Sequence, residues 1–391
     1  MNSVTILMAC SVGCCAAAAA LGLVNLRRYR RFGCNEIGEH SESSEIPHIS
    51  VCIPARNEES NIEACVRSVL ANRGVNIEVL VYDDDSSDGT PRILSALTSQ
   101  DGRVRRVDTQ DLPLDWNGKQ WGCERMGQAS KGEWLLFTDA DVRLSPDCLK
   151  TTWIAANASK CDLLSTVPRQ ITGTWMEDAI VPLIHFVLLS YLPMGQMRTT
   201  TLPAASAGCG QFLFVRRSMW ARSGGHASFR QSMHDGIKLP RAVRSVGGRT
   251  DLFDGTELAE CRMYRSAGQV WRGFAKNAYE GLGSFALLLF ITVIHIVGHV
   301  LPWGWIVWAL FTNQIATTVT TLAVVAITIA TLQRMIFAKR FRHSLRAIVL
   351  HPLGILLLTF IQWHSLWIAK TGRRSWKGRS GISTDSACLP T

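Results

Sequence analysis

The sequence lacks any pair of cysteines in a Cys-x-x-Cys spacing, although it has 12 cysteines in 391 residues. The cysteines are scattered. Cys14 and Cys15 lie inside an apolar run, and Cys52, Cys65 and Cys148 occupy positions typical of a core. A disulfide framework is expected in short secreted chains, and this chain has neither property. The cysteines therefore indicate a reduced protein that faces the cytosol.

Two phosphate-binding signatures and a nucleic-acid signature are also missing. There is no Gly-x-Gly-x-x-Gly and no Gly-Lys-Ser/Thr motif, which argues against a dinucleotide site or a P-loop. The net charge is +10, but the basic residues form no single stripe with interleaved aromatics, so we expect no nucleic-acid partner. They cluster beside apolar blocks, as is typical of positive charge kept on the cytoplasmic face of a bilayer.

Four apolar blocks are long enough to interact with a membrane. The first, residues 4–24, carries no charge over about 20 residues, the length of a membrane-spanning helix. Arginines follow it and no basic segment precedes it, which indicates an uncleaved anchor rather than a signal peptide. The other blocks cover residues 282–311, 315–332 and 347–369.

These blocks predict the organisation of the chain. We expect a membrane anchor at residues 1–26, a cytoplasmic domain at 46–281, a transmembrane region at 282–369 and a basic tail at 370–391. The protein is then a multi-pass protein of the inner (cytoplasmic) membrane, with its large domain in the cytoplasm.

The positive-inside rule conflicts with itself at the last block. A third full span after the domain places the basic residues beyond 369 outside, although the loop at 334–346 is already basic and inside. Either the rule fails here, or residues 347–369 form a re-entrant or interfacial segment; we expect a cytoplasmic C-terminus.

A shorter apolar stretch at 179–194 predicts either an amphipathic helix on the membrane face or an ordinary buried helix.

The domain between the blocks begins with a β-α-β pattern. Residues 49–53 and 77–81 alternate as strands do. Between them, Ser60 and Glu63 have the spacing of a capping box in front of a run with helical periodicity. Short connections of this kind favour a parallel sheet with its ligand crevice at the carboxyl ends of the strands.

Polar residues follow each predicted strand. The first run leads into Arg56-Asn57-Glu58-Glu59, the second into Asp83-Asp84-Asp85, and a third at 134–138 into Asp139-Ala140-Asp141. Carboxylates gathered at one sheet edge repel one another unless a cation or a donor-rich ligand joins them. Hard carboxylate oxygens two residues apart suit Mg²⁺ or Mn²⁺, which can bridge to diphosphate oxygens. The pattern therefore predicts a divalent cation that is brought in with a nucleotide diphosphate.

These motifs resemble those of family 2 glycosyltransferases with the GT-A fold. "IPARNEE" resembles the family's opening strand and turn, "VYDDDSSDGT" its nucleotide-binding acidic loop, and "TDADV" its metal-binding motif. "LPLDWNGKQWG", "CRMY", "WRGFAKN" and "SWKGRSG" resemble the membrane-bound branch that glycosylates lipids, particularly carotenoid- and hopanoid-associated enzymes. The resemblance covers residues 49–379. It implies an α/β, Rossmann-like nucleotide-diphospho-sugar transferase domain between N-terminal and C-terminal transmembrane helices.

The resemblance implies roles for individual residues. The residues that would hold the base and ribose of the nucleotide-sugar are Pro54, Asn57, Glu58, Asp83 and Asp84. Asp139 would contact the nucleotide and share the metal with Asp141. The family places an acidic base before a helix in its second half, often as a pair of acids. Here His234 replaces the first acid and Asp235 remains as the candidate base; His234 either orients Asp235 or fills space.

An inverting transfer needs a carboxylate that takes the proton of the attacking hydroxyl and cations that stabilise the departing diphosphate. Lys119, in a Gly-Lys turn, is a candidate for that cation or for a nucleotide contact. Lys377 and Arg379 are candidate phosphate contacts if the tail is cytoplasmic; the alternative is lipid headgroup anchoring. Glycines at 208 and 210 permit close backbone approach, either as the floor of the acceptor pocket or in a tight turn.

The sequence thus predicts an inverting hexosyltransferase that moves a sugar, by default from a UDP-hexose, to a lipid hydroxyl at the cytoplasmic leaflet. UDP-GlcNAc and GDP-mannose are the other donors considered. A processive polysaccharide synthase is one alternative, although its Gln-x-x-Arg-Trp motif is absent. A non-catalytic membrane scaffold that retains the fold is another, which the replacement at His234 would suit.

Overall fold

The computed structural model describes residues 2–32, 47–313, 315 and 317–371, together with the backbone at 375–376 and 379–380. Two compact units interleave along the chain. The helical unit comprises Met1–Arg30, Arg169–Gln196 and Arg262–Leu366, and the sheet unit comprises Arg31–Pro168, Met197–Cys261 and Trp367–Thr391. Each unit is therefore assembled from segments that are distant in sequence.

The sheet unit is built on a seven-stranded mixed sheet with the order β3-β2-β1-β4-β8-β6-β9. β1 is parallel to β2 and β4, whereas β8 is antiparallel to β4 and β6. Outside this sheet, β5 pairs antiparallel with β10, and β11 pairs antiparallel with β12. The strands are β1 (His48–Ala55), β2 (Asn76–Asp83), β3 (Val104–Val107), β4 (Trp134–Thr138), β5 (Val142–Leu144), β6 (Leu163–Ser165), β8 (Phe212–Arg216), β9 (Thr250–Leu252), β10 (Ala259–Cys261), β11 (Ser375–Trp376) and β12 (Arg379–Ser380).

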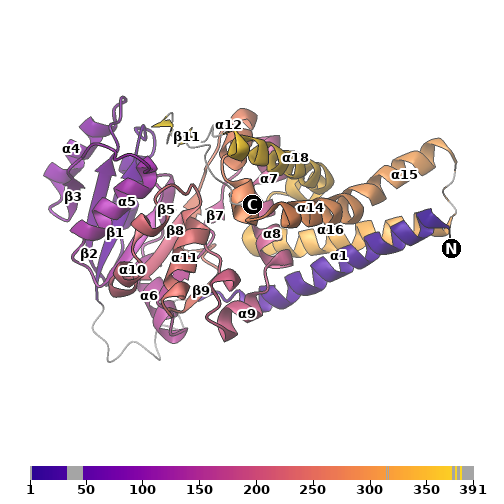
Figure 1. Cartoon of the computed structure of the whole chain (residues 1–391), viewed down its shortest axis with the longest axis horizontal. Helices are drawn as coiled ribbons and strands as arrows, with labels where there is room; N and C mark the ends of the chain where they lie inside the picture. Colours follow the sequence, from indigo (N-terminus) through magenta and orange to yellow (C-terminus); the bar gives the residue numbers. More distant parts are fainter. Residues whose placement is uncertain are drawn as a thin grey trace, which may run out of the picture. The chain divides into compact units, whose positions relative to one another are not determined.

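Helices connect the strands and cover the sheet (Figure 1). In α3 the apolar residues recur at helical spacing and are buried. The predicted capping box is wrong, because Asn61 is the N-cap and no side chain caps this helix. The carbonyl oxygen of Glu58 instead accepts bonds from the N–H groups of Asn61 (2.9 Å) and Ile62 (2.8 Å). The helices are α3 (Ile62–Leu70), α4 (Thr90–Gln100), α5 (Gly118–Ala129), α6 (Cys148–Ala158), η2 (Pro203–Ala205), α10 (Arg217–Arg222), η3 (His226–Phe229) and α11 (Asp235–Ser245), and α9 (Met194–Thr199) contains residues of both units.

Parallel pairing brings three strand ends to one edge of the sheet. In the register of β1 and β2, Pro54 lies opposite Tyr82 and Ala55 opposite Asp83. β4 runs parallel to β1 on its other side and ends at Thr138. The turns that follow β1, β2 and β4 therefore leave the sheet at the same edge, which is where ligands bind in open parallel sheets.

Four segments are long and apolar enough to cross a membrane, by length and composition: Ser3–Arg28, Phe285–Phe311, Thr318–Phe341 and His351–Lys370. All lie in the helical unit, except that the last four residues of the fourth fall in the sheet unit. The second segment is continuous through one turn of π-helix, η4. The elements are α1 (Ser3–Arg28), β7 (Arg169–Gln170), α7 (Trp175–Ile180), α8 (Leu183–Tyr191), α12 (Ala267–Ala275), α13 (Ala278–Leu282), α14 (Phe285–Ile294), η4 (His295–Val300), α15 (Leu301–Phe311), α16 (Thr318–Phe341), α17 (Arg346–Val349) and α18 (His351–Lys370).

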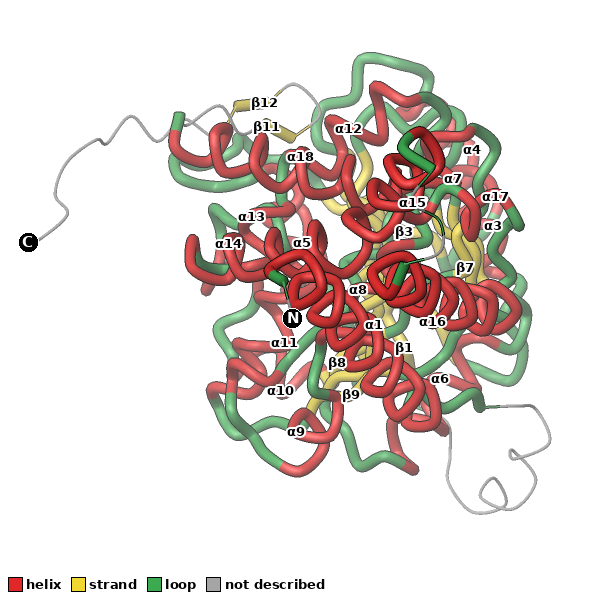
Figure 2. The backbone as a smooth tube through the Cα atoms, turned by 90° about the vertical axis from the view of Figure 1, so that its right-hand side faces the viewer, coloured by secondary structure: helices red, strands yellow, loops and turns green. Residues whose placement is uncertain are grey.

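The N-terminal helix is packed into this unit. α1 and α16 lie side by side in Figures 1 and 2. Their close approach requires Gly22, where an added Cβ would lie 2.5 Å from Nε2 of Gln333. Asn25 Nδ2 donates to the carbonyl oxygens of Leu189 (2.8 Å) and Leu192 (2.6 Å). Small residues and interhelical hydrogen bonds of this kind stabilise helix packing where lipid surrounds the helices.

Two apolar stretches left open by the sequence form packed helices. Most residues of α8 are buried within the unit, so the stretch at 179–194 contains an ordinary buried helix. α18 is one helix of 20 residues, without the reversal of direction that a re-entrant segment requires. The side of the membrane on which the C-terminus lies stays a prediction, as does the linear division into anchor, domain, transmembrane region and tail.

Candidate active site

Hydrogen bonds join the turns that follow β1 and β2. Asn57 has a φ of 52°, in the left-handed region that asparagine tolerates better than most residues. Its N–H donates to Oγ of Ser86 (2.9 Å), and its Oδ1 accepts from the N–H of Ser87 (2.9 Å). The N–H of Glu58 donates to Oγ1 of Thr90 (2.8 Å). Asn57 and Glu58, both predicted nucleotide contacts, are thus held in a preformed loop.

Asp83 and Asp84 lie at the end of β2 beside this loop. Asp83 is buried; its Oδ1 accepts from Oγ of Ser86 (2.5 Å), and its Oδ2 lies 3.2 Å from Nη2 of Arg106 on β3. Oδ2 of Asp84 lies 3.6 Å from Nη1 of Arg56. Both predicted nucleotide-binding carboxylates are therefore oriented by arginines for which the sequence predicted no role.

Lys119 joins two carboxylates that are far apart in sequence. Its Nζ lies 2.7 Å from Oδ1 of Asp139 and 2.9 Å from Oδ2 of Asp235. Lys119 is in the first turn of α5, Asp139 follows β4, and Asp235 begins α11. The side chains are 16%, 31% and 8% exposed, so solvent screens these ion pairs weakly. The candidate base, a candidate nucleotide ligand and the candidate cation form one cluster.

The cluster sets the protonation state of the candidate base. Burial alone raises the pKa of Asp235, but the charge and hydrogen bond of Lys119 outweigh it and the pKa lies below its usual value. Burial alone lowers the pKa of Lys119, but Asp139 and Asp235 raise it well above its usual value. His234, the N-cap of α11, adds a smaller contribution that lowers the pKa of Asp235. At neutral pH, Asp235 is therefore an ionised carboxylate that can accept a proton.

Asn117 connects the Lys119 turn to the segment that precedes Asp235. As the N-cap of α5, its Oδ1 accepts from the N–H of Lys119 (2.9 Å). Its own N–H donates to the carbonyl oxygen of Arg230 (2.8 Å). One residue thus ties the turn that carries Lys119 to the segment that precedes Asp235. The sequence marked the Asn-Gly-Lys turn but not its contact with residues more than a hundred positions later.

Glycines 208 and 210 pack against the turn that carries Asp235. A Cβ added at Gly210 would lie 2.0 Å from Oδ1 of Asp235, and one at Gly208 would lie 2.9 Å from the carbonyl oxygen of Gly236. Oδ1 of Asp235 also accepts from the N–H of Gly236 (2.8 Å). The close backbone approach expected at these glycines is present, and its partner is the candidate base.

We expect Gly210→Ala to lower kcat about 100-fold, the scale of loss when a reacting group is displaced by about 1 Å, because the added methyl group displaces the Asp235 carboxylate. Nucleotide affinity should be nearly unchanged. Gly102→Ala is the matched control, since a Cβ there meets no atom within 4 Å. Steady-state kinetics and nucleotide titration distinguish the two effects; equal kcat values in both variants would show that Asp235 is not at the reacting centre.

Asp141 offers an oxygen suited to a divalent cation. Its Oδ1 is buried and accepts no hydrogen bond from the part of the chain that the structure describes. Burial, and then the charges of Asp139 and Glu58, raise the pKa of Asp141 to about 7. A bound cation would offset both the cost of burying the charged carboxylate and its repulsion by Asp139 and Glu58.

The residues present fit a cation that takes few protein ligands. Among the described residues, no group of three His, Cys, Asp or Glu side chains could hold a metal. Mg²⁺ commonly binds through one or two carboxylates and completes its shell with water and substrate phosphates. Asp139 and Asp141 are therefore sufficient protein ligands for the predicted Mg²⁺ or Mn²⁺.

His226, which the sequence did not single out, is buried behind the cluster. Its Nδ1 accepts from Nε1 of Trp220 (3.1 Å), and its ring lies 4.4 Å from that of Phe137 at the end of β4. Burial lowers the pKa of His226 to about 3, so its ring is neutral. No periodicity or motif marks this position, because only the tertiary fold places it there.

The two C-terminal candidates are not placed. Lys377 lies outside the described residues, and only the backbone of Arg379, in β12, is described. Their phosphate contacts stay predictions.

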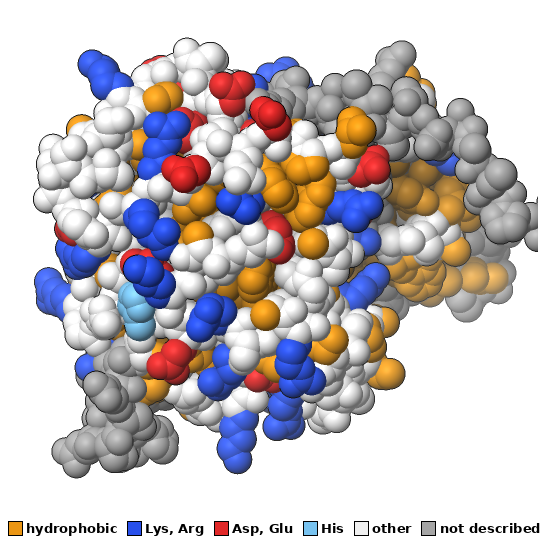
Figure 3. All heavy atoms as spheres, turned by 60° about the vertical axis from the view of Figure 1, so that its left-hand side comes forward, with side chains coloured by type: hydrophobic (Ala, Val, Ile, Leu, Met, Phe, Trp, Pro, Cys, Tyr) orange, Lys and Arg blue, Asp and Glu red, His pale blue; other side chains and the backbone are white. Residues whose placement is uncertain are grey.

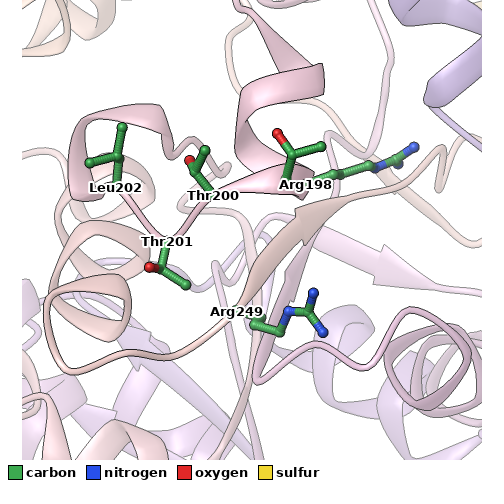
Figure 4. Close-up of a pocket in the computed structure, with 6 residues that line it drawn as sticks. Arg198, Thr200, Thr201, Leu202 and Arg249 are labelled. Carbon is green, nitrogen blue, oxygen red and sulfur yellow. The ribbon is translucent and has the colours of Figure 1, made fainter.

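A cavity of about 450 Å³ in the sheet unit contains none of the predicted site residues. Its lining residues are Arg198–Leu202 and Arg249 (Figure 4). Arg198 is paired with Asp251, with its Nε 2.9 Å from Oδ2.

On the face drawn in Figure 3, basic side chains are interspersed with acidic ones rather than gathered in one stripe.

Comparison with known proteins shows which family part of the chain matches. The family described as Glycosyl transferase family 2 matches residues 50–222. The chain is 23% identical over 299 residues to a 4,4'-diaponeurosporenoate glycosyltransferase of Staphylococcus haemolyticus, covering 75% of this chain and 76% of the relative. It is 26% identical over 265 residues to the enzyme of the same name in Staphylococcus aureus, covering 64% and 68%.

A solved structure shares the fold. The chain superposes on a mannosyltransferase from Pyrobaculum calidifontis, in complex with GDP-Man and Mn²⁺, with a TM-score of 0.54 and 16% identity, covering 92% of this chain and 99% of that one. The segment matched by the family contains the acidic strand ends and Lys119, whereas Asp235 lies beyond it.

Proposed function

We propose that the chain is a family 2 glycosyltransferase, and that it transfers a hexose, by default from UDP, to a lipid hydroxyl with inversion at the anomeric carbon; the family match over residues 50–222 and the shared GT-A fold support this. The observation that carries the proposal is the bridge from Lys119 to Asp139 and Asp235. It joins an ionised carboxylate and a cation at the sheet edge where nucleotides bind in such folds.

In the proposed reaction, Asp235 takes the proton of the acceptor hydroxyl as its oxygen attacks the anomeric carbon. Proton transfer neutralises Asp235, so the positive charge of Lys119 loses one of its two negative partners. Lys119 then stabilises the negative charge that develops on the departing diphosphate. The fixed turns at Asn57 and Asp83 orient the nucleotide. A divalent cation held by Asp139 and Asp141 would supply further positive charge to the diphosphate when bound.

A lipid acceptor at the cytoplasmic leaflet is supported by the helical unit. Basic residues occupy the last turns of α1 and α16, where the positive-inside rule places them in the cytoplasm: Arg27, Arg28, Lys339 and Arg340. The two staphylococcal relatives are named for a carotenoid-related substrate. We propose that this chain also acts on a lipid acceptor, and that it is a multi-pass protein of the inner membrane.

The proposal is tested with full-length protein in native lipid extract, Mn²⁺ and radiolabelled UDP-glucose, UDP-GlcNAc or GDP-mannose. Label from one donor should enter the organic phase, and a chelator should abolish the transfer. Label in a water-soluble polymer would instead indicate a polysaccharide synthase. Nucleotide binding without transfer from any donor would indicate a scaffold that retains only the fold.

A further inference from the structure

The helical unit contains a fully buried arginine. Arg334 is 0% exposed and lies on α16, seven residues before the helix ends at Phe341. Its Nη1 lies 3.4 Å from the carbonyl oxygen of Pro182, and its Nη2 lies 3.4 Å from that of Ala347. Both distances are long for hydrogen bonds, and Nε has no partner among the described residues. The five N–H donors of the guanidinium are therefore poorly satisfied.

None of the carboxylates that the structure describes forms an ion pair with Arg334. The two acidic residues of α7, in the same unit, have other partners. Asp178 accepts from Oγ of Ser344 (2.7 Å), and Glu177 lies 3.4 Å from Nε of Arg262. An isolated charge in a buried site is strongly unfavourable, and such charges in apolar helices commonly mark functional sites. A counter-charge from outside the chain would remove this penalty.

Arg334 shares one neighbour with two histidine rings that have unused hydrogen-bonding groups. Its Cζ is 5.8 Å from the ring centre of Phe186, which is 5.2 Å from that of His299 and 4.9 Å from that of His351. Nε2 of His351 and Nδ1 of His299 share a hydrogen bond of 3.3 Å. The other two ring nitrogens are buried and have no partner among the described residues. Whichever neutral tautomers are present, one of these two nitrogens carries a proton that it can donate.

Two further features favour an anion over a metal cation. α18 begins at His351, so the positive end of its helix dipole is at this cluster. In the described part of the chain, no three His, Cys, Asp or Glu side chains form a metal site, and the charge of Arg334 would repel a cation. The four long helices of this unit are apolar enough to cross a membrane, so an anion that reaches this cluster is expected to carry an alkyl chain.

We propose that Arg334, His299 and His351 bind the anionic headgroup of an amphiphile, a phosphate or a carboxylate, between α8, η4, α16 and α18. The guanidinium supplies the counter-charge, an imidazole supplies a second donor, and the attached alkyl chain extends toward the lipid that surrounds the apolar helices. This proposal does not depend on the proposed transfer reaction, because all of the residues that would bind the headgroup lie in the helical unit.

The test is binding of dodecyl phosphate to the full-length protein in an uncharged detergent, measured by native mass spectrometry and calorimetry. One equivalent should bind, and Arg334→Gln should weaken binding about 10- to 100-fold, the loss expected for a hydrogen bond to a charged group. Arg346→Gln, on the exposed face of α17, is the matched control and should bind as wild type does. Dodecanol and inorganic phosphate, which each lack one half of the ligand, should bind at least about 10-fold more weakly.

Three results would overturn the proposal: wild-type affinity in Arg334→Gln, equal affinity for dodecanol, or equal affinity for inorganic phosphate. The last would indicate a site for a free anion. If Arg334→Gln does not fold, Arg334→Lys keeps the charge and should still prefer dodecyl phosphate to dodecanol; loss of that preference would also overturn the proposal.

Discussion

Asp235→Asn is expected to lower kcat/KM for sugar transfer by about 100- to 10,000-fold, the range contributed by a positioned general base. The amide matches the carboxylate in volume but cannot take the proton of the attacking hydroxyl. Because the acidic turns after β1 and β2 are untouched, the nucleotide dissociation constant should change by less than about threefold. Initial rates and equilibrium nucleotide binding on the same preparation measure the two quantities.

Asp162→Asn is the control for this variant. Asp162 precedes β6 in the same unit, and its Oδ1 lies 3.7 Å from Nε of Arg216. This substitution makes the same chemical change away from the cluster and should leave transfer at the wild-type rate. A wild-type rate in Asp235→Asn would instead remove Asp235 from the mechanism.

Lys119→Met is expected to shift the acid limb of the pH profile of kcat/KM to higher pH. In the wild type, Lys119 lowers the pKa of Asp235 against the opposing effect of burial. Without that cation, burial raises the pKa of Asp235, and a base acts only in its deprotonated form. The rate at acidic pH should therefore fall about tenfold for each unit of pKa increase and recover as the pH rises. The plateau at high pH should remain about 100-fold below wild type, because the diphosphate has lost a cation.

The pH profile separates this role from a purely structural one. Lys119→Arg keeps the charge and should retain an acid limb near that of the wild type. Lys131→Met removes an exposed lysine of the same unit and should change neither limb nor plateau. An acid limb that does not move in Lys119→Met would contradict the ion pair with Asp235.

The location of the site could be predicted because it follows from local patterns. Alternating apolar residues define the strands, and parallel β-α-β connections place their carboxyl ends together. The acidic residues after those strands, Asp83, Asp84, Asp139 and Asp141, therefore had to meet at one edge. The pairing of Ala55 with Asp83 and the end of β4 at Thr138 agree with this expectation.

The contacts that complete the site depend on tertiary packing and could not be predicted. Two glycines indicated a close backbone approach, but nothing in the sequence indicated that Gly210 approaches Asp235. Arg106 reaches Asp83 from a neighbouring strand, and its position depends on the register of β2 and β3. The capping box predicted at Ser60 was wrong, because the carbonyl oxygen of Glu58 accepts hydrogen bonds from the N–H groups of Asn61 and Ile62 at the start of α3.

The helical unit was foreseen only in outline. Hydropathy located its long helices, since length and apolar composition are local properties. It did not indicate that residues 169–196 pack with those helices, or that Arg334 is enclosed among them. Buried polar groups interrupt the apolar pattern without revealing their partners, so their environment becomes visible only in the folded chain.

The anomeric configuration of the product tests direct displacement at Asp235 most directly. It is measured by NMR on the glycolipid formed from whichever α-linked nucleotide-sugar the donor panel selects. Direct attack by a hydroxyl that Asp235 deprotonates predicts a β-linked product from the first turnover. An α-linked product would contradict that mechanism, because retention requires a second displacement that this arrangement of Asp235, Lys119 and Asp139 does not provide.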